Sequence, residues 1–505
     1  MTQQPEIQAG DPLAGLPRHG LLNVAATLVP GVYAALLVSY FLHTLGPAGY
    51  APWAAAMALL GWLTLLDAGL ASTTTREAAR ALAGHRDGAE RVRTSNTLYA
   101  LLGLCAAVLG SIASLAIPLL LRLEGDEARN AWLVGVALSV DLAIVLGTSA
   151  WMGVIRGARR FEYLLVANVL QVAVALTTTV LLLPVMGLVG AGCGQIAGRL
   201  VGRSLAAALV KRAAPWFDLW PRPQSRTMFR RVTEFSLPIL ALQLAKQLGT
   251  GTDVIIVGAV ASSTAVGLYA AGSQLPRYVA QFLFPTFAVL LPAFSSIVVR
   301  DPRLVRGALL RGLLVCSILG AAAFGSLALD PHTVLDIWAG GSDPLSVGVL
   351  QLYAVAMIGV TPANVLTLML IAHGRHAILG ALVLIEASIN VVLSIILSLM
   401  VGPIGVAISS LVLILLDDVL VIPYVSSRRL GIPWRDLASW IGAGAVIGLA
   451  VAVVIRILPL PGLTGFGVKL VLGVGLVGLV TLLAWRVTSS HTAASGETAG
   501  VESGG

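Results

Sequence analysis

The sequence is short of charged residues. Of its 505 residues only 11% are charged, whereas soluble domains carry roughly a quarter. Hydrophobic residues make up 57% of the chain, and its mean hydropathy is +0.91. This composition excludes a soluble globular protein. The apolar runs are about 20 residues long, the length that crosses about 30 Å of hydrocarbon, so they indicate a multi-spanning membrane protein.

Cysteine is scarce as well, and nucleotide-binding motifs are missing. Cys105, Cys193 and Cys316 each lie within an apolar run, which argues against a disulfide framework and against a metal site. No G-x-x-x-x-G-K-[ST] motif occurs, and the loops are too short for an ATPase domain. We therefore expect no cofactor, and we expect the energy source to be a gradient of H⁺ or Na⁺, the membrane potential or removal of the substrate.

Hydropathy predicts an all-α integral membrane protein with about fourteen transmembrane helices. The run from Leu21 is too long for the apolar region of a cleaved signal peptide, so we expect it to remain as the first span. The predicted spans are residues 21–45, 50–70, 94–121, 131–153, 162–184, 188–212, 232–259, 267–299, 308–329, 345–371, 377–400, 404–426, 436–458 and 464–486.

The basic residues indicate the orientation of these spans. The chain has a net charge of +8, and its arginines lie mainly in alternate loops. The opposite loops contain almost only Arg122 and Arg129. The positive-inside rule then predicts that both termini are cytoplasmic, and nucleic-acid binding is not needed to explain the charge.

An internal repeat divides the chain into two lobes. YAPWAA at 50–55 matches VGLYAA at 266–271 with an offset of 267 − 51 = 216, and GLVGA at 187–191 matches GPIGV at 402–406 with 402 − 187 = 215. Ala158-Arg159 and Gly374-Arg375 agree at 216. Because each half holds six spans, both enter the membrane in the same orientation, which is the parallel type of transporter repeat. The alternative is a scaffold whose duplication reflects only ancestry.

The repeat predicts the following domain organisation. Residues 21–212 form the N-lobe, residues 231–426 form the C-lobe that repeats it, and residues 213–230 are a cytoplasmic linker between them. Residues 436–487 form two extra helices. Residues 1–20 are a cytoplasmic N-terminal tail, and residues 488–505 are a disordered cytoplasmic tail.

Polar residues follow single faces of three predicted helices. Gly190, Gly194, Gly198 and Gly202 recur every fourth residue and predict a ridge for close helix packing. The other stripes are Gln195, Arg199 and Arg203 on the same helix; Gln243, Lys246, Thr250 and Asp253 on the next; and Gln274, Arg277 and Gln281 on the third. Ionisable groups inside a span usually face a cavity or a partner.

Two interpretations of these charges stay open. The cations form a basic cavity for an anion, since arginine holds phosphate oxygens in a bidentate manner, or Lys246 and Arg277 only neutralise Asp253 and Asp141. Arg203 has the further alternative of extending to the cytoplasmic surface.

Four acids inside the predicted spans are candidates for ion coupling, because they can titrate or bind a cation. They are Asp141, Asp253, Glu386 and Asp417. An interhelical hydrogen-bond pair of Glu386 with Asn390 is the alternative for that position.

Several segments resemble a known family. LGPAGYAPW at 45–53, LLDAGL at 65–70 and TREAA at 75–79 are similar to motifs of Wzx-type polysaccharide flippases, within the multidrug/oligosaccharidyl-lipid/polysaccharide exporter superfamily, although Ala51 replaces the usual glycine. DVIIVG at 253–258, VGLY at 266–269 and EASIN at 386–390 resemble the second half of that family. The resemblance covers about residues 20–426.

The resemblance implies two six-helix lobes meeting in a V around a central cavity, with two extra C-terminal helices. It implies a bacterial inner-membrane flippase, not an enzyme, that carries an oligosaccharide on undecaprenyl diphosphate for polysaccharide biosynthesis, such as O-antigen of lipopolysaccharide or exopolysaccharide. The expected partners are this lipid-linked oligosaccharide, membrane lipid and a polymerase or chain-length complex. We expect Arg199, Arg203, Lys246, Arg277, Gln195 and Gln274 to bind the diphosphate and sugars.

Three other functions fit the sequence less well. A drug/cation antiporter of the same superfamily typically has an acid in the first span, and 21–45 has none. A lipid II flippase also has fourteen spans but a basic first span, whereas only Arg18 precedes this one. A polyprenyl-dependent enzyme would need a large outer loop, and the longest, at 330–344, holds Asp330, His332, Asp336 and Asp343 as a solvated turn.

Overall fold

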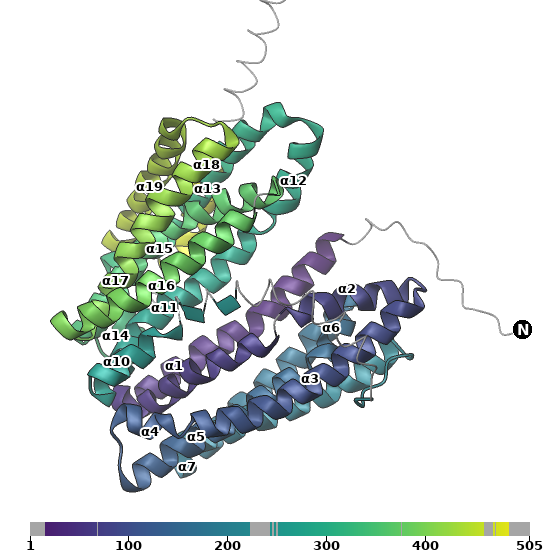
Figure 1. Ribbon diagram of the computed structural model, residues 1–505. Coiled ribbons are helices and arrows are strands. Elements are labelled where there is room, and N and C mark those ends of the chain that lie inside the picture. The colour runs from purple at the N-terminus through teal and green to yellow at the C-terminus, as the bar shows by residue number, and fades with distance from the viewer. Residues whose placement is uncertain are drawn as a thin grey trace, which may run out of the picture. The chain divides into compact units, whose positions relative to one another are not determined.

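The computed structural model describes residues 16–67, 69–222, 243–244, 247–248, 251–374, 376–458, 468–469 and 471–483. Every regular element in these ranges is helical (Figure 1). The chain divides into two compact units, residues 1–37, 59–119 and 123–243 in unit 1, and residues 38–58, 120–122 and 244–505 in unit 2. The all-α prediction is confirmed.

Ten helices of the described chain are long and apolar enough to cross a membrane. The fourteen predicted spans reduce to ten for three reasons. Two pairs of spans each form one element broken at a single glycine, Gly46 or Gly187. The span at 232–259 lies largely outside the described residues, and the last span contains the shorter apolar helix Val471–Leu483.

Unit 1 consists of long helices that pack side by side, among them α3, α5 and α7 (Figure 1). Its elements are α1 (Leu16–Gly61, continuing into unit 2), η1 (Trp62–Asp67), α2 (Leu70–Leu82), α3 (Arg86–Ala113), α4 (Ala116–Leu121, ending in unit 2), α5 (Gly125–Gly147), α6 (Ser149–Gly157) and α7 (Phe161–Ala213). Tyr99 and Val210 belong to its core, and the Tyr99 hydroxyl donates to Asp67.

The element α7 is a helical hairpin that turns at Gly187, where φ is 57°. A Cβ atom on Gly194 would lie 2.9 Å from the nitrogen of Thr179, one on Gly198 2.8 Å from the nitrogen of Ala175, and one on Gly202 3.0 Å from the oxygen of Ala167. The two arms therefore approach to backbone contact along the glycine ridge. This confirms the close packing that the four-residue spacing predicts.

Unit 2 has a core between its long helices, in which Leu313 and Leu366 are fully buried. Its elements are α10 (Asp253–Val260), α11 (Ser263–Phe287), α12 (Leu290–Arg300), η2 (Pro302–Leu304), α13 (Val305–Leu329), α14 (Pro331–Ala339), α15 (Pro344–Ala372), α16 (His376–Val401), α17 (Ile404–Ile414), the π-helical segment η3 (Leu415–Val421), α18 (Ile422–Leu430) and α19 (Trp434–Ile457).

The backbone supports the internal repeat. Gly187 and Gly402, which the repeat aligns, both have positive φ, 57° and 79°. The turns at Arg159 and Gly374 also have positive φ, 55° and 73°, and differ by 374 − 159 = 215 residues. Glycine adopts this left-handed conformation without a steric penalty. The same backbone device thus ends equivalent helices in both halves.

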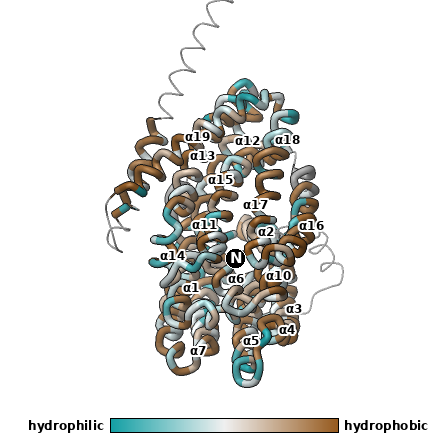
Figure 2. The backbone as a smooth tube through the Cα atoms, turned by 90° about the vertical axis from the view of Figure 1, so that its left-hand side faces the viewer, coloured by the Kyte–Doolittle hydropathy of each residue, from teal (hydrophilic) through white to brown (hydrophobic). Residues whose placement is uncertain are grey.

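The surfaces of the helices are apolar rather than polar. Hydrophobic residues run along the helices, as Figure 2 shows, and Leu104, Leu399 and Met400 are 64–72% exposed. In water such exposure would be unfavourable, whereas lipid tails are as apolar as leucine. These faces are therefore suited to contact with lipid.

Candidate functional site

In unit 1, a largely but not fully buried ion pair joins α7 to α5. The Nε of Arg199 lies 2.8 Å from Oδ1 of Asp141, and its Nη2 lies 3.0 Å from Oδ2. The two side chains are 19% and 13% exposed. This bidentate geometry is the strongest form of such a contact, so Asp141 fixes the guanidinium plane of Arg199.

One helical turn earlier on the same face, Gln195 donates from Nε2 to the hydroxyl of Tyr33 at 3.0 Å. Tyr33 lies on α1 and is buried. The predicted stripe of Gln195 and Arg199 is therefore engaged with two other helices of unit 1.

Arg203, one turn beyond Arg199, lies within electrostatic range of Arg199, Asp141 and Arg156. Its Nε and Nη1 atoms are covered, and neither has a hydrogen-bond partner in the described chain. These two donors do not reach solvent, as the alternative of extension to the surface would require.

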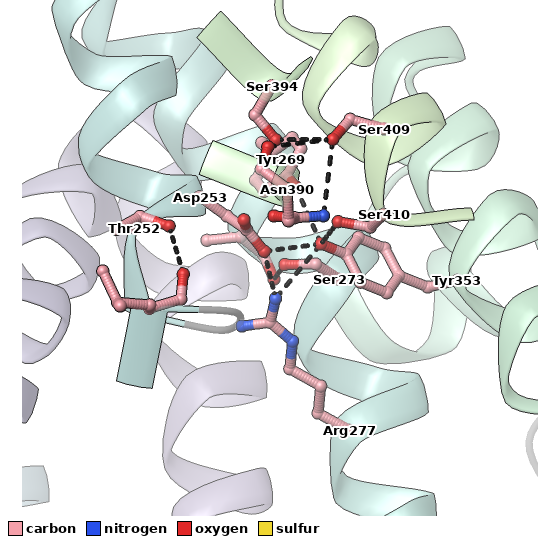
Figure 3. Close-up of polar contacts among 12 residues, drawn as sticks. Thr252, Asp253, Tyr269, Ser273, Arg277, Tyr353, Asn390, Ser394, Ser409 and Ser410 are labelled. Carbon is pink, nitrogen blue, oxygen red and sulfur yellow. Dashed lines mark hydrogen bonds and ion pairs between the residues drawn. The ribbon is translucent and has the colours of Figure 1, made fainter. Parts of the chain in front are cut away.

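In unit 2, four helices bring a second ion pair together (Figure 3). Asp253 begins α10 and is fully buried. Its Oδ2 accepts from Nη2 of Arg277 at 2.6 Å and from the hydroxyl of Tyr353 at 2.6 Å. The Arg277 side chain, on α11, is 21% exposed. Its guanidinium carbon lies 5.1 Å from the centre of the Tyr353 ring, within the range of a cation–π contact.

The Tyr353 hydroxyl is the centre of this network. It lies 3.1 Å from Nη2 of Arg277, 3.0 Å from the hydroxyl of Tyr269 and 3.3 Å from Oγ of Ser410 (Figure 3). Because the phenol donates its proton to Asp253, it can accept from these neighbours. Protonation or displacement of Asp253 would therefore change hydrogen bonds on α11, α15 and α17 together.

Two buried acceptor atoms beside this network lack partners. They are Oδ1 of Asp253 and Oδ1 of Asn390, each without a hydrogen bond in the part of the chain that the structure describes. Asn390 on α16 donates to Ser409 on α17 at 3.4 Å, and Ser409 lies 2.8 Å from Ser394. The predicted interhelical contact at this position thus comes from Asn390 and serines.

The remaining acids lie around η3. Glu386 on α16 is within electrostatic range of Asp417 and Asp418, which lie in the π-helical segment. Asp417 is 8% exposed. Turns of π-helix are rare in proteins, and those that occur are often found at functional sites. Across the described residues no group of three or more histidine, cysteine or acidic side chains has the arrangement of a metal site.

The predicted site residues divide between the units. Gln195, Arg199 and Arg203 belong to unit 1, whereas Gln274 and Arg277 belong to unit 2, where Gln274 is half-buried. Lys246 lies outside the described residues. Arg199 and Arg277 are both in ion pairs, as the neutralisation alternative requires, with Arg199 rather than Lys246 as the second cation.

Sequence reasoning missed the tyrosines. Tyr33 and Tyr353 lie in apolar runs, where an aromatic side chain gives the same hydropathy signal whether it faces lipid or a buried carboxylate. The internal repeat provides the signal that points to them. It relates Gln195 to Ser410, 215 residues further on, and each of these two residues contacts a tyrosine hydroxyl.

These helices, with paired ionisable groups inside each unit, define a multi-pass membrane protein. A family model described as "Polysaccharide biosynthesis protein" matches residues 18–298, more than half of the chain. The chain therefore belongs to the polysaccharide biosynthesis protein family, which confirms the resemblance noted in its sequence.

Known proteins support this placement. A putative O-antigen transporter from Shigella flexneri is 24% identical over 144 residues, which is 28% of this chain and 34% of that relative. The chain thus matches about a third of the length of the curated relative.

Solved transporters share the fold. The lipid II flippase MurJ, in an inward closed conformation, has a TM-score of 0.68 at 13% identity, covering 94% of this chain and 98% of that one. An inward-facing multidrug resistance MATE transporter of the MOP superfamily has a TM-score of 0.65 at 16% identity, covering 82% and 94%. At these identities the likeness concerns the fold alone, and it confirms the predicted fold class.

Proposed function

We propose that this protein is a flippase that moves an undecaprenyl-diphosphate-linked oligosaccharide across the bacterial cytoplasmic membrane for O-antigen or exopolysaccharide biosynthesis. It works by alternating access, with both termini in the cytoplasm, and makes no covalent change in its substrate. Family membership supports the pathway, and the predicted topology supports the orientation.

The observation that carries the proposal is the partly exposed, bidentate ion pair of Arg199 with Asp141. A carboxylate and a diphosphate present oxygens to a guanidinium in the same planar way. Asp141 can therefore keep Arg199 oriented when no substrate is bound, and a diphosphate oxygen can replace it. Arg277 and Asp253 give unit 2 an equivalent pair.

The exchange also supplies a route to ion coupling. When a diphosphate takes the guanidinium, the released carboxylate loses its counter-charge and gains affinity for a proton or a sodium ion. Asp253, with one unpaired buried oxygen, is the strongest candidate for this role, and Asp141 is the second. Glu386, which is half-buried, and the buried Asp417 are further candidates in the same unit.

The test is complementation of a strain that lacks the gene. Lipid-linked oligosaccharides are measured by mass spectrometry, and an impermeant sugar-modifying reagent reports which side of the membrane they face. We expect Arg199→Ala and Arg277→Ala to accumulate finished, cytoplasm-facing units when output is normalised to the amount of protein in the membrane. The matched controls are Arg129→Ala and Arg306→Ala, which break exposed ion pairs and should complement fully.

The outcomes separate the competing functions. Normal glycan output from both Arg199→Ala and Arg277→Ala would contradict the role of the ion pairs. Accumulation of lipid II in the deletion strain would indicate a lipid II flippase. Unchanged lipid-linked sugars with increased sensitivity to cationic dyes would indicate a drug antiporter.

A further inference from the structure

Unit 1 contains a small polar cavity in addition to its ion pair. The cavity has a volume of about 200 Å³ and lies between α1, α6 and α7. Its lining residues are Asn23, Ala26, Thr27, Pro30, Arg156, Leu164 and Asn168. By sequence, Arg156 belongs to the loop arginines that set topology, whereas the structure places it in the wall of this cavity. We call this space the Arg156 cavity.

The charged member of the wall is available to a ligand. Within the described ranges Arg156 has neither a hydrogen bond nor an ion pair, and the residue is exposed in the wall of the cavity. The acid that acts on it electrostatically is Asp67, which already accepts the hydroxyl of Tyr99. Five N–H donors of the guanidinium are thus directed to no protein oxygen.

The polar wall adds one donor at a fixed position, on Asn168, because the single proton of the Thr27 hydroxyl is already donated. The Thr27 hydroxyl donates to the carbonyl of Asn23 at 2.9 Å, and Nδ2 of Asn168 donates to the carbonyl of Ala26 at 2.8 Å. An amide nitrogen carries two N–H groups, so Asn168 keeps one for a ligand. The contact to Ala26 also fixes its direction.

A second cation lies next to this wall. Arg203 follows Gly202, which packs on Ala167, the residue before Asn168. Arg203 and Arg156 act on each other electrostatically. Two nitrogens of Arg203 are buried without a partner. Since Asp141 is taken by Arg199, the region holds three arginines against two aspartates, and an anion would supply the missing counter-charge.

We propose that the Arg156 cavity binds the phosphate group of a lipid, with Arg156 as its direct ligand and Arg203 as the second positive charge. The volume is below that of pockets for drug-sized molecules, so it admits a phosphate or diphosphate but not an oligosaccharide repeat. The binding of phosphate stands on these residues alone. That the lipid is the transported substrate rests on the proposed function.

The experiment measures binding by the purified full-length protein in nanodiscs of zwitterionic phosphatidylcholine. The probes are undecaprenyl diphosphate and phosphatidylglycerol, each added at increasing concentration and detected by native mass spectrometry. We expect Arg156→Gln to weaken binding about tenfold or more, because a charge-assisted hydrogen bond is lost, and Arg156→Lys to restore part of it. Arg160→Gln is the matched control, because Arg160 is exposed and pairs with Glu162.

Asn23→Asp keeps the shape of the wall and adds a negative charge, so it should also weaken binding even if Arg156→Gln fails to fold. Selective loss of undecaprenyl diphosphate binding would identify the site as one for the substrate headgroup. Equal loss of binding of both lipids would identify a general phospholipid site. Either result supports phosphate binding in the Arg156 cavity. Unchanged binding in folded Arg156→Gln and Asn23→Asp would overturn it.

Failure of the proposed function has a different signature. If the deletion strain shows normal lipid-linked oligosaccharides while Arg156→Gln still loses phosphate binding in nanodiscs, the site stands and the flippase function falls. If flipping is confirmed while Arg156→Gln binds both lipids as the wild type does, phosphate binding in the Arg156 cavity is refuted and the flippase function is supported.

Discussion

The ion pair of Asp253 with Arg277 allows a quantitative prediction. Asp253 is fully buried and accepts two hydrogen bonds at 2.6 Å, one from Arg277 and one from Tyr353. Asp253→Asn keeps the shape but removes the carboxylate that pairs with Arg277. Removing one partner of a buried pair costs about 3–5 kcal/mol. We expect a loss of that order in the free energy of unfolding.

The double variant separates the pair from its surroundings. Asp253→Asn with Arg277→Gln removes both charges, so it should be more stable than the sum of the single losses predicts, with a coupling energy of about 2–3 kcal/mol. The exposed pair of Arg306 and Asp436, 60% and 30% exposed, is the control, and its coupling should be about 0.2–1 kcal/mol.

The assay is reversible unfolding, followed by intrinsic fluorescence in mixed detergent micelles, of the wild type and of the two single variants and the double variant of each pair. Equal coupling energies for the buried and the exposed pair would refute the reasoning, because burial would then have no energetic effect. A double variant as unstable as the two single losses combined would refute it too.

Two further changes test the packing of unit 1. Gly198→Ala should lower the free energy of unfolding by about 1–3 kcal/mol, because its Cβ would lie 2.8 Å from the nitrogen of Ala175. Gly442→Ala is the control and should have no such effect, because there is open space around that position. Equal thermal stabilities of the two variants would contradict close packing along the glycine ridge. Asn96→Ala should lower the free energy of unfolding by about 1–3 kcal/mol, because the buried Asn96 amide donates to the carbonyls of residues 218 and 219. Limited proteolysis tests whether these hydrogen bonds hold the segment that follows α7 in place. Cleavage after residue 222 at the wild-type rate would contradict this role of Asn96.

The sequence could predict features that depend on spacing along one helix. The glycine ridge and the turn at Gly187 follow from four-residue periodicity and from the preference of glycine for positive φ, and the structure has both. The sequence also predicts the pairing of intramembrane charges as one of two alternatives, because isolated charges are costly in lipid.

What the sequence could not predict is which helices meet. Asp141 and Arg199 are 58 residues apart, and Asp253 and Tyr353 are 100 apart, so no local periodicity joins them. Arg156 shows the same limit, since hydropathy assigns a residue by its neighbours in sequence and not by the helices that cover it. The π-helical segment at 415–421 likewise has no signal in apolar periodicity.

The two halves share a hydrogen-bonding pattern but differ in charge. Gln195 and Ser410, 215 residues apart, each contact a buried tyrosine hydroxyl. Eight residues further on, the same offset relates Arg203 to Asp418, so a cation in one half corresponds to an acid in the other. Duplication therefore kept the positions that join helices and changed the sign of the adjoining charge. Under the proposed function, Arg203 adds a cation for phosphate binding in unit 1, and Asp418 adds an acid in unit 2 beside Glu386 and Asp417, which are candidates for ion coupling.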